Sequence, residues 1–96
     1  MKTSDRLSLR VKVEGRVQGV WFRGWTIEQA RARGLDGWVR NRSDGSVEAL
    51  FSGPAADVLA MVAACRRGPP AARVTSLTQW PADPPAEAGF RSLRTD

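Results

Sequence analysis

The chain has 96 residues, a formal net charge of +5 and 42% hydrophobic residues, which suits one domain with a small core. It contains no histidine and one cysteine, Cys65, so the composition excludes an intramolecular disulfide, a zinc site built from these residue types and a histidine proton shuttle. Because a lone cysteine fits a reducing compartment and charged residues interrupt the apolar pattern near the N-terminus, we expect a cytoplasmic protein without a signal peptide or membrane span.

The N-terminal part of the chain predicts a strand followed by a helix. Apolar residues alternate with polar ones from Leu7 to Glu14, which is typical of a half-buried strand. A short turn with two glycines, residues 15–21, then leads into a helix from about Phe22 to Arg33. Gly34 directly after this segment is a suitable residue for ending the helix.

A β-hairpin is predicted next. The segment from Gly37 to Asn41 has the composition of a strand, and the Asp44-Gly45 pair supplies the positive φ angle that a tight hairpin turn needs. On the returning strand, Val47, Ala49 and Phe51 face one way.

The C-terminal part predicts a second helix and a fourth strand. Gly53-Pro54 opens the helix, with proline at a position where its missing N–H does no harm, and Gly68-Pro69-Pro70 ends it. The fourth strand, Arg73 to Trp80, alternates poorly, because a regular strand would point Val74 and Leu77 to opposite faces. After a loop rich in proline and alanine, Phe90 to Arg94 is predicted as a short final strand.

The element order is therefore β-α-β-β-α-β, which defines the ferredoxin-like α+β fold class. We expect an antiparallel sheet with two helices on one face, formed by a single domain over residues 1–96, with residues 1–5 as a loose tail. A fold of this kind does not by itself determine a function.

The turn between the first strand and the first helix has the properties of an anion-binding loop. Amide groups at a helix N-terminus have no intrahelical partner and lie at the positive end of the helix dipole. Gly15 and Gly19 allow the backbone to curl so that successive N–H groups face inward. Arg23 places a charged fork in the first helical turn, where it is unfavourable for the dipole and so indicates a function. A purely structural turn remains the alternative at this point.

The same segment resembles a known family signature. Residues 15–23 read GRVQGVWFR, which is similar to the acylphosphatase pattern G-x-V-Q-G-V-x-F-R at every fixed position. The similarity continues through the residues GWVRN at 37–41 and the Asp44-Gly45 pair and covers about Leu7 to Phe90. The family commonly ends in phenylalanine, any residue and a β-branched residue, and Phe90-Arg91-Ser92-Leu93 departs from this ending.

The resemblance implies a role for each matching residue. Arg23 would bind the phosphoryl group through its side chain, and Asn41 would position the attacking water, with no cofactor and no metal. The backbone amides of the loop would hold the phosphate; the loop consists of Gly15, Arg16, Val17, Gln18, Gly19, Val20, Trp21 and Phe22. The implied substrate is a small acyl phosphate, inorganic phosphate and sulfate would compete with it, and we expect a monomer without nucleic-acid or membrane partners.

The chemistry of acyl phosphates fits this residue set. The leaving carboxylate belongs to an acid with a pKa of about 4, so it departs without a proton and needs no general acid. Phosphoryl transfer passes through a loose transition state, for which positioning and charge stabilisation supply most of the catalysis. Asn41 can hold a water molecule and cannot deprotonate it, so our hypothesis is in-line attack by water, with a substrate phosphate oxygen as proton acceptor and no phosphoenzyme.

Several other residues receive structural interpretations. We expect Cys65 to lie in the core, Trp38 to serve packing, and Gln18 to hold the shape of the loop through a hydrogen bond. Three further arginines are expected to raise the local positive potential without touching substrate; they are Arg16, Arg40 and Arg42.

Two alternative functions remain open. Residues 1–42 carry ten basic and four acidic residues, and a basic half of this kind also suits nucleic acid. RNA-recognition domains, however, need aromatic residues on the two central strands, and Leu7 to Glu14 contains none. The second alternative is a catalytically weak domain that senses phosphate or handles carbamoyl phosphate, against which the intact Arg23 and Asn41 argue.

Overall fold

The computed structural model describes residues 5–96 and has the predicted order of strands and helices. The expected tail, residues 1–5, lies outside the described residues except for Asp5, whose carbonyl accepts a hydrogen bond from Ala55 N at 2.9 Å. Among the described residues, no helix is long and apolar enough to cross a membrane. The elements are β1 (Arg6–Arg16), α1 (Phe22–Ala32), β2 (Asp36–Asn41), β3 (Val47–Pro54), α2 (Ala55–Arg67), β4 (Arg73–Pro81) and β5 (Phe90–Ser92).

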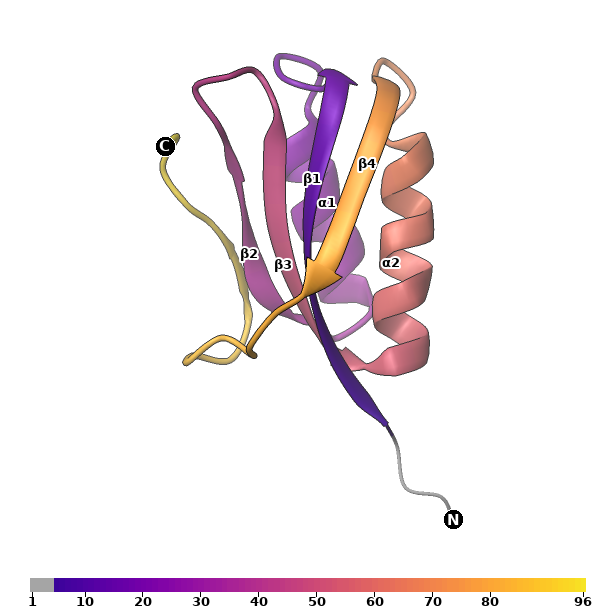
Figure 1. The fold of residues 1–96 in the computed structure, drawn as a ribbon, viewed down its shortest axis with the longest axis vertical. Helices are drawn as coiled ribbons and strands as arrows, with labels where there is room; N and C mark the ends of the chain where they lie inside the picture. The colour runs from indigo at the N-terminus through magenta and orange to yellow at the C-terminus, as the bar shows by residue number, and fades with distance from the viewer. Residues whose placement is uncertain (1–4) are drawn as a thin grey trace.

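The strands form one sheet in the order β4-β1-β3-β2-β5. β1 pairs antiparallel with β3 and β4, and β2 pairs antiparallel with β3. Both helices cover the same face of this sheet, as Figure 1 shows, so the ferredoxin-like α+β fold is confirmed. The short β5 adds a strand parallel to β2, which makes the complete sheet mixed where the sequence predicts an antiparallel one.

The core fills the space between the sheet and the two helices. Alternate residues of β1 point into it, and the opposite residues of that strand face away from the helices, as the period of a strand requires. Phe51 of β3 is fully buried and stacks on Phe90 of β5 with 5.6 Å between ring centroids. The largest fully buried side chains include Phe22, Phe51, Met61, Val11, Val13 and Val58.

The irregular pattern of β4 has a local cause. Glu14 pairs with Ser76, and the next residue, Gly15, pairs with Val74, so Thr75 is an extra residue on β4. A β-bulge of this kind shifts the alternation by one residue. Val74 and Leu77 therefore both pack against the core, and the expectation that they point to opposite faces is wrong.

The C-terminal end of the chain follows β2. β5 covers only Phe90–Ser92, which is shorter than the predicted strand, but hydrogen bonds continue beyond it. Leu93 N donates to Val39 O at 2.9 Å, and Asp96 N donates to Asn41 O at 3.1 Å. The last residues thus run along β2 to the end where Asn41 lies.

Candidate active site

The end of β1 and the loop that joins it to α1 depart from ordinary backbone conformations. Gly15, Gly19 and Trp21 have φ angles of 124°, 75° and 69°. At Gly15 a side chain is also excluded by close approach, because a Cβ would lie 2.1 Å from the carbonyl oxygen of Arg73 on β4. The chain can therefore leave β1 close beside β4 and curl toward the start of α1.

The amide groups of this loop lack internal partners. Trp25 N donates to Trp21 O at 3.0 Å and is the first amide after β1 to bond another backbone group. None of the amides of residues 17–24 donates to a backbone or side-chain acceptor among the residues that the structure describes. Free amides at a helix N-terminus are the donors that bind phosphate and other oxyanions in proteins.

A cleft of about 170 Å³ lies beside these amides. Arg23 in the first turn of α1 and Asn41 at the end of β2 both border it, and both are half-buried. The structure thus brings together two residues that are eighteen positions apart in the chain. The full lining consists of Val17, Gln18, Gly19, Trp21, Phe22, Arg23, Gly24 and Asn41.

The position of Asn41 follows from the alternation of β2. Val39 is fully buried beneath the helices, and a residue two positions later on a strand faces the same side. Asn41 therefore lies on the face that α1 covers, beyond the last core residue of β2. Trp38 and Arg40 occupy the opposite face.

Gln18 connects the loop to the β2–β3 turn. Its side-chain Nε2 donates to the carbonyl oxygens of Arg42 and Ser46, each at 2.8 Å. The predicted hydrogen bond that holds the shape of the loop is present, and it reaches the segment that immediately follows Asn41.

Not every residue of the predicted loop borders the cleft. Gly15 and Arg16 belong to β1, and Val20 is partly buried against the core. Gly24 borders the cleft and is absent from the sequence prediction. A glycine in the first turn of a helix, where it is costly, was the available signal for it.

Arg40 and Arg42 lie in an ion-pair cluster on the sheet face that the helices leave open. Both donate to Glu48 Oε1, at 2.9 and 2.8 Å, and Arg10 Nε donates to Glu48 Oε2 at 2.6 Å. Burial alone would raise the pKa of Glu48, but the hydrogen bonds from the three arginines lower it below its ordinary value. The side chain of Asp96 also pairs with Arg40 and Arg42. Neither Arg40 nor Arg42 borders the cleft, which agrees with the expectation that they do not touch substrate. That they raise the local positive potential stays a prediction, although Glu48 and Asp96 offset part of their charge.

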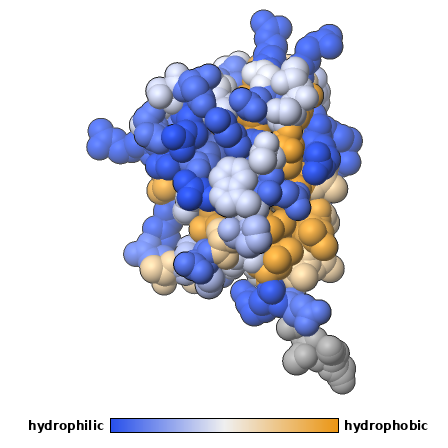
Figure 2. All heavy atoms as spheres, viewed as in Figure 1, coloured by the Kyte–Doolittle hydropathy of each residue, from blue (hydrophilic) through white to orange (hydrophobic). Residues whose placement is uncertain are grey.

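Trp38 belongs to the same open face. The guanidinium carbons of Arg10 and Arg40 lie 5.9 and 5.1 Å from its ring centroids, within the range of cation–π contact. Trp38 therefore packs against arginine side chains and does not border the cleft, as the packing interpretation predicts. Figure 2 shows that hydrophilic residues cover most of the upper part of this face.

Cys65 is a core residue, as the sequence predicts. It is 1% exposed, and burial raises the pKa of its thiol to about 12. A buried thiol of this kind is not a nucleophile at neutral pH. Within residues 5–96, no three side chains of the metal-binding types lie close enough together to hold an ion.

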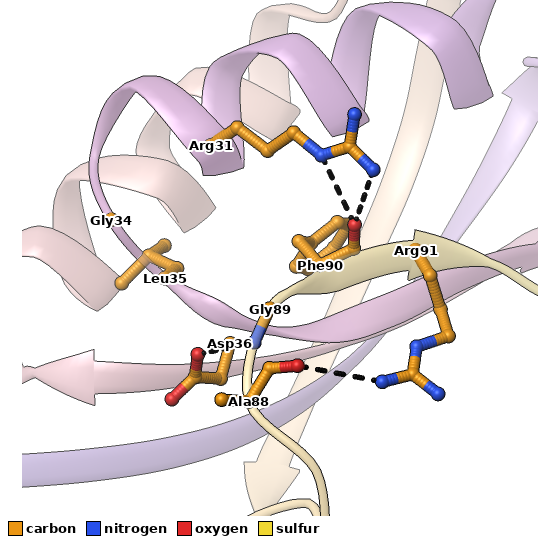
Figure 3. A pocket seen from close by; sticks show the side chains of 8 residues that line it. All are labelled: Arg31, Gly34, Leu35, Asp36, Ala88, Gly89, Phe90 and Arg91. Carbon is orange, nitrogen blue, oxygen red and sulfur yellow. Dashed lines mark hydrogen bonds between the residues drawn. The ribbon is translucent and has the colours of Figure 1, made fainter.

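A larger hollow of about 470 Å³ lies at the far end of α1, between that helix and β5 (Figure 3). Arg31 borders it, but its Nε and Nη2 both donate to Phe90 O, at 3.1 and 2.9 Å. Asp36 Oδ1 in turn accepts from Gly89 N at 2.8 Å. Arg31 and Asp36 are thus held by the main chain at Phe90 and Gly89, and none of the predicted site residues borders this hollow.

Comparison with known proteins agrees with the geometry of the cleft. The acylphosphatase family profile matches residues 9–92. An acylphosphatase of Rhodospirillum rubrum is 59% identical over 83 residues, which cover 86% of this chain and 91% of that protein.

Solved structures show the same similarity. The acylphosphatase of Bacillus subtilis is 38% identical with a TM-score of 0.86, covering 91% of this chain and 98% of that one. The acylphosphatase of Coxiella burnetii is 29% identical with a TM-score of 0.88, covering 97% and 100%. With a family profile matched over most of its length and a close relative of nearly the same extent, this chain belongs to the acylphosphatase family.

Proposed function

We propose that this protein hydrolyses the carboxyl–phosphate bond of small acyl phosphates by direct attack of a water molecule that Asn41 holds. The observation that carries the proposal is that Arg23, Asn41 and most residues of the loop whose amides lack internal partners border one cleft. Membership in the acylphosphatase family supports the reaction class. The roles of the individual residues rest on the chemistry of their side chains.

The phosphoryl group binds to the loop. Its oxygens carry negative charge, and the free amides supply several hydrogen-bond donors at the positive end of α1. Arg23 adds a planar, permanently charged group that can contact two oxygens at once. Donors fixed by the fold stabilise the transition state without having to reorganise during the reaction.

Asn41 positions the water. Its side-chain oxygen accepts a hydrogen bond from the water and directs the lone pair of that water toward phosphorus, but an amide cannot remove the proton. The P–O bond to the acyl group breaks as the bond from water forms, and the carboxylate leaves with the electron pair. A phosphate oxygen takes the proton of the attacking water, so the products are a carboxylate and inorganic phosphate.

The reaction needs neither a general acid nor a metal. The carboxylate leaves unprotonated because its acid has a pKa of about 4, and Arg23 with the loop amides supplies the positive charge that a cation would otherwise supply. Inorganic phosphate and sulfate have the shape and charge of the bound group, so we propose that both compete with substrate.

A nucleic-acid-binding function has less support. On the open face, the side chains of β1 that would meet RNA are polar or charged, and Phe51 of β3 is buried beneath the helices. Arg10, Arg40 and Arg42 are already held by Glu48. We also propose that the protein acts as a single-domain monomer in the cytoplasm, which agrees with its free, buried Cys65.

Hydrolysis of benzoyl phosphate in water enriched in ¹⁸O tests the proposal. Attack at phosphorus places the label in inorganic phosphate. In a separate kinetic assay, added inorganic phosphate should compete with substrate. Label in benzoate would show attack at the carbonyl carbon and overturn the mechanism. Binding of phosphate without hydrolysis would favour the alternative of a phosphate-sensing or carbamoyl-phosphate-handling domain.

A further inference from the structure

Trp21 has an unusual backbone conformation for an aromatic residue. It precedes α1 with φ 69° and ψ 22°, and it is the non-glycine residue with positive φ among the described residues. Bulky side chains are outliers in this left-handed region, and such outliers cluster at functional sites. The conformation of Trp21 therefore suggests that the position of its indole matters for function.

The indole lies at the cleft and faces solvent. Trp21 is 59% exposed and borders the same cleft as Arg23 and Asn41. Val17 and Phe22, the other large apolar residues of the lining, are 1% and 2% exposed because they belong to the core. Trp21 is therefore the large apolar surface that the cleft presents to a ligand.

Gly24 leaves room for the indole of Trp21. A Cβ built on Gly24 would lie 2.1 Å from Trp21 Nε1 and 2.7 Å from its Cδ1. The five-membered ring of the indole thus rests against the backbone of the first turn of α1, and any side chain at position 24 would displace it. A glycine that weakens a helix here makes room for an exposed tryptophan.

We infer that Trp21 is a specificity-determining residue, which gives the acyl group of the substrate an apolar wall and favours aromatic acyl phosphates over acetyl phosphate. This inference rests on the proposed function. The phosphoryl group takes the polar donors of the cleft, and the acyl group attached to it extends toward solvent, where Trp21 is exposed. Contact between two aromatic groups is favourable beyond the burial of area alone, whereas an acetyl group offers one methyl.

The test compares kcat/KM for benzoyl phosphate and acetyl phosphate in matched variants. Trp21→Ala should lower the ratio of the two values by roughly three- to tenfold, and Trp21→Phe, which keeps a ring, should retain most of it. Gly24→Ala should also lower the ratio, because it displaces the indole without removing it. Trp80→Ala removes another exposed tryptophan, on β4 and away from the cleft, and should leave the ratio at the wild-type value.

Each outcome separates this inference from the proposed function. If Trp21→Ala and Gly24→Ala lower kcat/KM equally for both substrates, or change neither value, Trp21 only shapes the loop. The inference is then wrong, but the proposed hydrolytic function is unaffected. If the wild-type protein hydrolyses neither substrate, the proposed function itself fails. Gly24→Ala still decides the matter if Trp21→Ala does not fold, which circular dichroism would show.

Discussion

The side chain of Gln18 donates a hydrogen bond to the main-chain oxygen of Arg42 at 2.8 Å, and Arg42 directly follows Asn41 in the chain. The loop with the free amides and the strand that carries Asn41 are therefore joined by one side chain, which also reaches Ser46 O. A site that must hold a phosphoryl group and a water in line depends on such connections, since small displacements of catalytic groups are costly.

Substitution of Gln18 by methionine should weaken both stability and catalysis. Methionine has a similar length but no donor, so two hydrogen bonds are lost. The two carbonyls keep one partner each, Gly45 N for Arg42 O and Arg42 N for Ser46 O, so the free energy of unfolding should fall by about 1–2 kcal/mol. Denaturant unfolding and benzoyl phosphate kinetics measure the two effects. Loss of stability with wild-type kinetics would show that the connection is only structural.

Substitution of Arg23 by lysine should rescue little activity. Lysine keeps the positive charge but loses the planar fork that can contact two phosphate oxygens. In the proposed mechanism Arg23 binds the phosphoryl group in both the ground and the transition state, so KM should rise and kcat should fall. Steady-state kinetics on a variant shown to be folded measures both constants. Retention of most activity would mean that a point charge suffices and that bidentate contact is not required.

Turnover should not depend on a metal ion. The positive charge at the cleft comes from Arg23 and the loop amides, and no cluster of metal-binding side chains is present in the described part of the chain. Prolonged treatment with a chelator and addition of magnesium should each leave kcat/KM at its untreated value. Activity that disappears on chelation and returns with a particular cation would refute the mechanism.

Acid should destabilise the fold through Glu48. Its pKa is lowered from 4.5 in the folded protein, so its contribution is complete above that pH and is lost as pH falls below it. Glu48→Gln should cost on the order of 2 kcal/mol at neutral pH and flatten the decline in acid. A residual slope should remain, because hydrogen bonds from Ser46 also lower the pKa of Asp44. Unfolding measured across this range would contradict the account if both proteins lost stability in parallel.

Local patterns in the sequence were sufficient for the element order, whereas the choice of Arg23 and Asn41 as site residues depended on the resemblance to a family signature. Alternation from Leu7 to Glu14 and the glycines and prolines between segments marked the strands and helices that the structure contains. Gln18 and Cys65 have the structural roles that their chemistry predicts. That Arg23 and Asn41 border one cleft follows from the fold, because β2 ends beside the start of α1.

The features that sequence reasoning missed depend on pairing between distant segments. The bulge at Thr75 exists because β4 shifts register against β1, and no local pattern marks that shift. Arg40 of β2 lies directly opposite Glu48 of the neighbouring β3, so knowledge of the hairpin register would have revealed this ion pair. The parallel β5 arises from the path of the loop before Phe90, which composition does not specify.

The most direct test of the mechanism is the kinetics of Asn41→Ala with benzoyl phosphate. In the proposed mechanism Asn41 holds the water and not the substrate. The value of kcat should therefore fall by a factor of about 100, in line with the loss of one positioned polar group, while KM stays near the wild-type value. Ser43→Ala, an exposed residue of the adjoining turn that does not border the cleft, should behave as wild type. A raised KM with unchanged kcat would contradict the account, because it would show that Asn41 binds substrate and that another group positions the water.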